Sequence, residues 1–235
     1  MMFVYPNWIM PLFNKLEPLQ DDDLKGKIEG LSKGVSFPLT KLYQMDGSKR
    51  SSHSNAFMFG FWKNKRIVIY DTLLKQCTHQ QILAVLAHEL GHWLHGHVTI
   101  NLVISSVHIF VTFYLYGQVM YSKELFEAFF YTDTNAVIIG LMLFQYIYSP
   151  VETLLSLGMT MFSRRNEFQA DENAVAMGYA DELEVALKVI SKENKGDLNP
   201  DPWFAWYHFS HPALIERLDG IKQQKVRYIE KKKTQ

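Results

Sequence analysis

The chain has 235 residues, and its 24 Lys plus Arg balance its 24 Asp plus Glu. This length allows one domain with a sizeable core, or one domain with a membrane part. A balanced net charge gives no electrostatic reason to expect nucleic acid as a partner. The single cysteine, Cys77, cannot form a disulfide within the chain, which fits a reducing compartment.

The first part of the chain predicts a helix and a small sheet. Residues 1–20 are apolar and contain three prolines. They lack a basic n-region and a cleavage site, so we interpret them as a membrane-proximal segment, not a signal peptide. Residues 21–34 have the apolar spacing of a short helix. Strand-like runs at 39–45, 53–62 and 66–70 then predict a small antiparallel sheet.

The stretch His88-Glu89-Leu90-Gly91-His92 ends an apolar run with helical spacing. In a helix, His88 and His92 lie on one face, with Glu89 beside them. This spacing is typical of hydrolytic zinc sites, in which two imidazoles bind the metal and the carboxylate accepts a proton from water. The five-residue pattern also fits an ordinary amphipathic helix. A third metal ligand elsewhere in the chain would distinguish a zinc site from such a helix.

A candidate third ligand follows the last apolar run of the chain. Glu167 and Asp171 are four residues apart in a stretch with helical character. Glu167 can complete a His-His-Glu ligand set, and Asp171 can accept a hydrogen bond from a ligand imidazole. The alternative is a solvated acidic face that pairs with Arg164 and Arg165.

Two long apolar runs separate these motifs. Residues 98–121 contain no Asp, Glu, Lys or Arg, and residues 134–163 contain one, Glu152. At about 1.5 Å per residue, each run exceeds the roughly 30 Å hydrocarbon core, which predicts a transmembrane hairpin that returns the chain to the zinc helix. Two core helices of a soluble protein are the less favoured alternative. His95 and His97 are interpreted as polar residues at the membrane boundary.

Glu152 and Pro150 are the exceptions within the second apolar run. An ionisable group at that depth is expected to face protein or a water-filled cavity, unless it lies at the interface. Pro150 predicts a kink. The loop between the two runs has one Lys and three acidic residues, so the positive-inside rule places the zinc motif on the cytosolic side.

The sequence contains five informative segments: Ser54-Asn55-Ala56, Lys63 to Leu74, His88 to Trp93, Asn166 to Asp171, and His208 to Pro212. Together they resemble the type I CAAX prenyl proteases, which are integral-membrane zinc metalloproteases. The similarity runs nearly end to end, but it covers only the C-terminal half of such proteins. Family members carry further transmembrane helices before the point that matches Met1, so those helices, or another chain, are expected partners.

The resemblance implies one Zn²⁺ per chain, with Glu89 as the catalytic base. It also implies that His211 donates to the oxyanion of the scissile carbonyl and that Arg217 braces a carboxylate. Asn55 and Ala56 are the implied substrate-binding edge of the sheet. On the residues alone, His211 also fits a loop histidine, and the segment at Asn55 also fits a plain strand start.

The expected fold is therefore mainly α with a small antiparallel β-sheet, an α+β zincin-like catalytic core, plus two transmembrane helices. The expected division is a membrane-proximal segment at 1–20, catalytic parts at 21–97 and 164–235, and the transmembrane hairpin at 98–163. The metal ligands are expected to be His88, His92 and Glu167.

The resemblance implies a zinc metalloendopeptidase that removes the last three residues from prenylated CAAX proteins at a lipid membrane. Two alternatives stay open at this stage. One is a membrane quality-control metalloprotease with the same zinc ligands and no lipid requirement. The other is a non-catalytic membrane scaffold that retains zinc for structure, although an intact Glu89 argues against it.

The basic residues at the end of the sequence allow a prediction of the cellular compartment. The last residues, Lys231-Lys232-Lys233-Thr234-Gln235, form a solvated basic tail or a dilysine retrieval signal for the endoplasmic reticulum. If the signal operates, a tagged chain with serine at Lys232 and Lys233 should leave the endoplasmic reticulum membrane when followed by microscopy. Unchanged localisation would remove this hypothesis.

Overall fold

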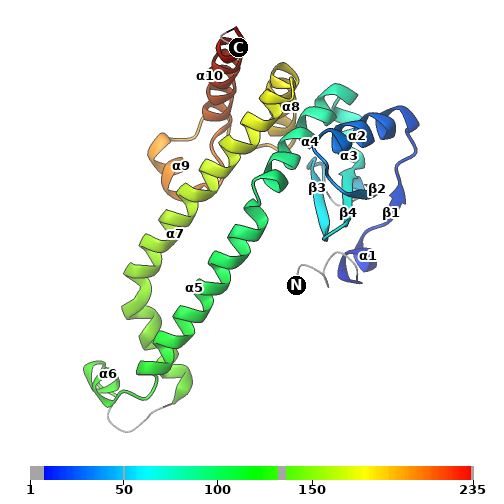
Figure 1. The fold of residues 1–235 in the computed structure, drawn as a ribbon. Coiled ribbons are helices and arrows are strands. Elements are labelled where there is room, and N and C mark those ends of the chain that lie inside the picture. Colours follow the sequence, from blue (N-terminus) through cyan, green and yellow to red (C-terminus); the bar gives the residue numbers. More distant parts are fainter. Residues whose placement is uncertain (1–7, 50, 132–135, 234–235) are drawn as a thin grey trace.

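The computed structural model describes residues 8–49, 51–131 and 136–233. A part formed by short helices and a sheet stands at one end of a long helical hairpin (Figure 1). The elements are α1 Met10–Phe13, β1 Leu16–Pro18, α2 Asp22–Gly34, β2 Leu39–Met45, the 3-10 helix η2 Gly47–Lys49, β3 Ala56–Phe61, β4 Asn64–Tyr70, α3 Asp71–Gln76, α4 His79–Leu94, α5 His97–Val119, α6 Lys123–Ala128, α7 Val137–Ala176, α8 Ala180–Glu193, α9 Pro202–His208 and α10 Leu214–Lys233.

The sheet is mixed, whereas the sequence analysis predicted an antiparallel one. Its strand order is β1-β2-β4-β3. The outer pairs β1/β2 and β3/β4 are antiparallel, but the central pair β2/β4 is parallel. The reason is that the β3–β4 hairpin joins the sheet through its second strand, so β4 runs in the same direction as β2. This arrangement leaves β3 as an edge strand.

The strand positions follow the predictions closely, with one addition. β2 has the predicted bounds, whereas β3 begins three residues later than predicted and β4 begins two residues earlier. Strand β1 was not predicted; its residue Glu17 pairs with Gln44 of β2. The described end of the proposed membrane-proximal segment therefore belongs to the sheet. A strand of three residues that ends in a proline is too short to show the period of two by which strands are predicted.

Helix α4 is the centre of the hydrophobic core. Thr78 and Gln81 form the capping box at its start. Its apolar face packs between the sheet and the helices α7 and α8, and it buries several side chains to 3% exposure or less: Ile82, Leu83, Leu86 and Leu90. Each such burial contributes about 1.5–3 kcal/mol relative to an exposed side chain. The helix that carries the histidine pair is therefore rigidly held.

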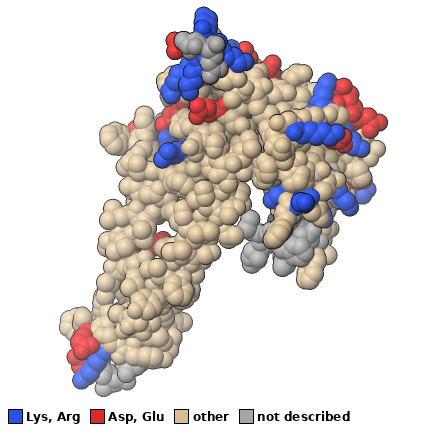
Figure 2. Space-filling model, in the orientation of Figure 1, with Lys and Arg blue, Asp and Glu red and all other residues tan. Residues whose placement is uncertain are grey.

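Helices α5 and α7 form the predicted hairpin, and both are long and apolar enough to cross a membrane. Figure 1 shows them side by side, with α6 at the loop end. The 23 residues of α5 span about 35 Å at about 1.5 Å per residue, and none of its most apolar window is buried. Figure 2 shows that side chains of the hairpin are largely uncharged, while charged residues gather at its two ends.

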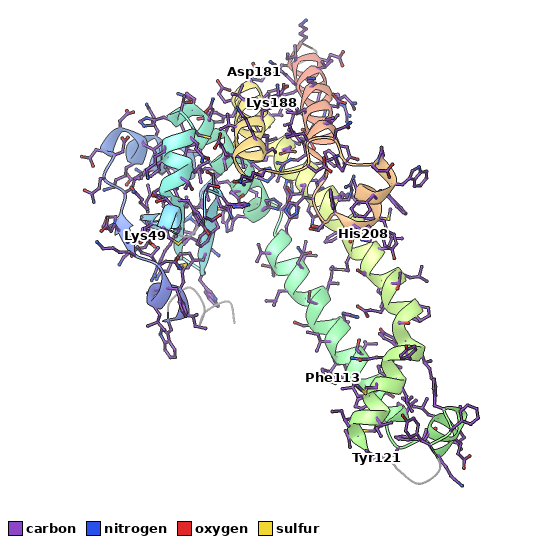
Figure 3. All side chains as sticks on the ribbon, turned by 180° about the vertical axis from the view of Figure 1, so that it is seen from behind. Lys49, Phe113, Tyr121, Asp181, Lys188 and His208 are labelled. Atoms are coloured by element: carbon purple, nitrogen blue, oxygen red, sulfur yellow. The ribbon has the colours of Figure 1, made fainter. Side chains whose placement is uncertain are left out.

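The view from behind supports the same assignment of the hairpin. In Figure 3, Phe113 lies midway along α5 and Tyr121 lies near its loop end, while Asp181 and Lys188 lie at the opposite end of the molecule. Phe113 is 64% exposed. An exposed aromatic side chain on the hairpin and charged side chains away from it are the distribution that a bilayer around α5 and α7 favours.

Helix α7 is 40 residues long and contains Pro150. It passes the predicted domain boundary between residues 163 and 164 without a break. Proline removes the backbone N–H that would bond to the Tyr146 carbonyl. The hydroxyl of Ser149 donates to that carbonyl instead, at 3.0 Å. The Tyr146 carbonyl thus has a hydrogen-bond partner in the membrane-spanning part. The second helix of the hairpin and Glu167 belong to one continuous helix.

Glu152 has a partner across the hairpin. Its Oε2 lies 2.9 Å from Nε2 of His108 on α5. Both side chains line a cavity of about 480 Å³ between the two helices. Of the two environments considered from the sequence, the structure places Glu152 against protein and a cavity, as is usual for ionisable groups at membrane depth.

Gly91 allows α4 and α7 to approach each other closely. A Cβ added at Gly91 would lie 2.8 Å from Cα of Ala170 and 3.0 Å from Cβ of Asn173. The Asn173 amide also donates to the Ala87 carbonyl at 2.7 Å. This close contact brings the turn of α7 that carries Glu167 onto the turn of α4 that carries His88 and His92.

Replacing Gly91 by alanine is expected to lower the free energy of unfolding by about 1–3 kcal/mol, because the added methyl group overpacks the α4–α7 contact. Thermal and denaturant unfolding in detergent measure this change. The control is Gly30→Ala on α2, where an added Cβ meets nothing within 4 Å. That variant should be neutral or more stable, and equal losses at both glycines would contradict the account.

Candidate active site

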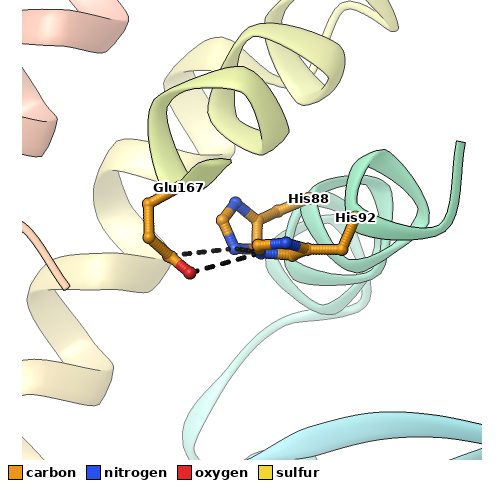
Figure 4. Close-up of side chains that lie close together, drawn as sticks. All are labelled: His88, His92 and Glu167. Carbon is orange, nitrogen blue, oxygen red and sulfur yellow. Dashed lines mark hydrogen bonds and ion pairs between the residues drawn. The ribbon is translucent and has the colours of Figure 1, made fainter. Parts of the chain in front are cut away.

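The site is formed by one turn of α4 and one turn of α7. His88 and His92 project from α4, and Glu167 projects from α7 toward both of them (Figure 4). His88 and Glu167 are buried, with 6% and 5% exposure, and His92 is partly buried. The three side chains that the sequence analysis named as metal ligands are thus brought together by the hairpin.

The distances among the three side chains fit a tetrahedral metal site. The two Nε2 atoms of His88 and His92 are 3.2 Å apart. Glu167 Oε2 lies 3.5 Å from His88 Nε2, and Glu167 Oε1 lies 3.3 Å from His92 Nε2. Ligands that sit about 2.0–2.1 Å from a tetrahedral Zn²⁺ are about 3.3–3.4 Å from each other. The cluster can therefore hold a metal ion without rearrangement.

Asp171 and Arg217 support His88 from behind. Asp171 is fully buried, and its Oδ1 accepts from Nδ1 of His88 at 2.8 Å. Arg217 on α10 donates to both Asp171 oxygens, at 2.6 and 3.0 Å. This is the carboxylate that Arg217 was expected to brace. The hydrogen bond to Asp171 fixes the proton on Nδ1 and leaves Nε2 of His88 to face the cluster.

Electrostatics at the site favours a bound cation. Burial acts to raise the pKa of Glu167, but hydrogen bonds with His88 and His92 outweigh it and hold that pKa well below its usual value. Burial and Arg217 act to lower the pKa of His88, whereas Asp171 and Glu167 raise it to about 9. Both shifts show that a positive charge is favoured beside Glu167, and a metal ion can replace the proton there.

Glu89 lines the same cavity as the cluster, a space of about 450 Å³. Burial raises its pKa. Within residues 8–49, 51–131 and 136–233, no hydrogen bond to the Glu89 carboxylate is found. A partly buried carboxylate with a raised pKa and without a fixed partner is suited to accept and return a proton.

The edge strand β3 forms one wall of this cavity, through Asn55 and Ala56. The Tyr70 N–H donates to the Asn55 carbonyl at 3.0 Å, so Asn55 faces β4. In an antiparallel pair the next residue faces the opposite way, so the N–H and C=O of Ala56 point toward the open edge. Both residues named from the sequence are therefore at the site.

Asn194, which the sequence analysis did not identify, closes the start of this edge. Its Oδ1 accepts from the Ser54 N–H at 2.7 Å, and its Nδ2 donates to the Ser54 carbonyl at 3.3 Å. An amide side chain pairs here with the strand as a neighbouring backbone would. The free part of the edge therefore begins at Ala56. No local sequence signal relates two residues 140 positions apart.

His211 lies at the mouth of the cavity, in the loop after α9. Its Nε2 is 3.3 Å from Glu167 Oε1, and its side chain is 67% exposed. In Figure 3, His208 marks the end of α9 beside α7. The structure thus brings His211 to the cluster, as expected for a residue that contacts substrate there. On the opposite side, α8 supplies an apolar wall of Leu183, Leu187 and Ile190.

His97 is buried more deeply than the sequence analysis implied. It was interpreted as a polar residue at the membrane boundary, but it is only 3% exposed. Its Nδ1 lies 2.9 Å from Nδ1 of His92, and its Nε2 lies 3.2 Å from Oε1 of Gln169. Gly96 ends the helical spacing with a left-handed φ of 65°, so the periodicity of α4 does not extend to His97.

A buried His-His-Glu cluster with a carboxylate beside it, on helices that continue into two apolar spans, defines a membrane metallopeptidase of the HExxH class. Comparisons with known proteins agree. The model of Peptidase family M48 matches residues 18–225. The chain belongs to this family of metallopeptidases.

Relatives match nearly the whole chain. The CAAX prenyl protease 1 homolog of Arabidopsis thaliana is 50% identical over 222 residues, which are 94% of this chain and 52% of the relative. The homolog of Homo sapiens is 41% identical, over 94% of this chain and 55% of the relative. The crystal structure of S. mikatae Ste24p matches with a TM-score of 0.85 and 39% identity, over 94% of this chain and 55% of that one. The chain spans about half the length of these relatives.

Asp171→Asn is expected to weaken metal binding at the cluster about 10–100-fold, because the substitution removes the charge that orients His88. It should also lower the free energy of unfolding by about 3 kcal/mol, which is the low end of the range for a broken buried ion pair. The low end is expected because Arg217 still faces a second carboxylate, that of Glu167. Chelator competition and unfolding curves measure the two effects.

Asp181→Asn is the matched control, because Asp181 pairs with Lys225 at the surface. It should leave metal affinity and stability unchanged. If Asp171→Asn behaves in the same way as this control, Asp171 does not support the metal ligands.

Proposed function

We propose that the metal is Zn²⁺, held by His88, His92 and Glu167, and that the chain is the catalytic part of a membrane zinc endopeptidase. Two imidazoles and one carboxylate with an open fourth position are the ligand set of catalytic zinc. The observation that carries the proposal is Glu89, since a structural zinc site has no use for an unpartnered carboxylate in the same cavity.

The proposed reaction is hydrolysis of a peptide bond. When bound, Zn²⁺ supplies a Lewis acid that lowers the pKa of water and polarises the scissile carbonyl. Glu89 accepts the proton of the attacking water and delivers it to the leaving amine as the C–N bond breaks. His211 donates a hydrogen bond to the oxygen of the former carbonyl. Arg217 and Asp171 hold His88 throughout.

The proposed substrate binds as an extended strand along β3. The outward N–H and C=O of Ala56 are the first free backbone groups of that edge, because Asn194 occupies those of Ser54. A peptide paired with this edge lies inside the cavity that Ala56 and Glu89 both line, with β3 on one side and Glu89 on the other. Asn55, which is exposed in the cavity wall, can contact the peptide with its side chain. The apolar residues of α8 favour an aliphatic side chain on the part of the peptide that faces them.

The proposed substrates are prenylated proteins with a C-terminal CAAX sequence, from which the last three residues are removed. The printed names of the relatives, CAAX prenyl protease 1, support this choice. So does the position of the site, because α5 begins five residues after His92 and α7 continues from the apolar span to Glu167. A prenyl chain can thus remain in an apolar environment while the peptide reaches water.

We further propose that the protein resides in the endoplasmic reticulum membrane with the site on the cytosolic side. Support comes from the distribution of Lys and Arg, which gather at the catalytic end of the hairpin (Figure 2). Lys231 to Lys233, in the last turn of α10, add to the positive charge at this end.

The test is cleavage of a farnesylated CAAX peptide by the chain in membranes. Zinc-dependent removal of the last three residues is expected. Glu89→Gln should lower kcat about 10²–10⁴-fold, the usual contribution of a general base, and should still bind zinc. The control is Glu172→Gln, an exposed position on α7 that should keep full activity. In the same assay, His211→Ala should lower kcat, and Asn55→Ala should raise KM.

Other outcomes of this assay select the alternatives. Equal cleavage of the farnesylated and the unmodified peptide would favour a quality-control protease. Zinc binding without cleavage, both alone and with the N-terminal half of the Arabidopsis relative supplied in trans, would favour a scaffold. Failure of the wild-type chain to bind zinc would contradict the proposal itself.

A further inference from the structure

The two histidine ligands have different partners behind them. His88 donates its Nδ1–H to the carboxylate of Asp171, whose charge is balanced by Arg217. His92 has no carboxylate in that position within the described residues; its Nδ1 faces Nδ1 of His97 at 2.9 Å. Metal-binding histidines are usually oriented by a partner on the second ring nitrogen. His97 is the group that occupies this place for His92.

We infer that His97 and Gln169 form a hydrogen-bonded relay that positions His92 for metal binding. This inference rests on the proposed metal site. With Nε2 of His92 facing the cluster, its Nδ1 carries the proton and donates to Nδ1 of His97. The His97 proton then lies on Nε2 and is donated to Oε1 of Gln169, at 3.2 Å. Each bond has one donor and one acceptor, so the tautomer of both rings is determined.

The relay depends on the junction between α4 and α5. Gly96 has a φ of 65°, and no side chain stands within 4 Å of its Cβ position. Glycine is needed there for the backbone conformation, which turns His97 back onto the last turn of α4. His97 is the first residue of the α5 span, and Gln169 lies on α7, two residues after Glu167. The relay therefore connects three helices at the end of the membrane hairpin.

A neutral relay differs from a carboxylate in what it provides. Asp171 gives His88 a buried negative charge as well as orientation, whereas His97 gives His92 an acceptor of fixed direction without charge. His97 is therefore a positioning residue, and its removal should allow the His92 ring to rotate or to change tautomer. The expected loss of zinc affinity is about 10–100-fold.

The experiment compares zinc affinity, by chelator competition, in four forms of the full chain in detergent. His97→Leu removes the acceptor and should bind zinc about 10–100-fold more weakly. His97→Asn places an amide oxygen where Nδ1 was, so it should restore affinity to within a few-fold of wild type. His95→Leu is the control, because the exposed His95 ring only stacks on His97, with centroids 5.4 Å apart.

Unfolding of the zinc-free protein is measured in parallel, since a merely structural role would lower stability together with affinity. The inference predicts that His97→Leu loses affinity while its zinc-free unfolding midpoint matches that of His95→Leu. Wild-type affinity in His97→Leu, equal losses at His95 and His97, or no rescue by asparagine would overturn it. A wild-type chain that does not bind zinc would instead overturn the proposed function.

Discussion

The close contact of α4 with α7 at Gly91 is the constraint on which the rest of the molecule depends. Only a residue without a side chain lets Ala170 approach α4 at this distance. The contact sets the spacing between the histidine pair on one helix and Glu167 on the other. The membrane hairpin makes this contact possible, because it returns the chain to its starting point after two spans.

The buried charges of Asp171, Glu167 and Arg217 at this contact each have a counter-charge. Asp171 pairs with His88 and Arg217. Glu167 faces both histidines. Such a network is costly to desolvate, and it is retained where a cation must be held in place. The absence of a fixed hydrogen bond at Glu89, among the described residues, is the one departure from full pairing, and it falls where the proposed chemistry needs a mobile proton.

The sequence was most informative where local geometry decides the outcome. Residues four apart on a helix must share a face, so His88 and His92 were predictable, as were the two apolar spans. It was least informative where distant segments meet. The parallel β2/β4 pairing, the Asn194 contact with Ser54 and the buried position of His97 all depend on tertiary packing, and for His97 on one glycine that ends the helical period.

The most direct test of the central claim is to locate the metal itself. Anomalous X-ray diffraction at the zinc edge, from crystals of the zinc-loaded chain, identifies both the element and its position. The account predicts one peak, about 2.0–2.2 Å from Nε2 of His88, Nε2 of His92 and a Glu167 oxygen. A peak only at the surface group of Asp21, Asp23 and His79, or no peak at the α4–α7 contact, would contradict it.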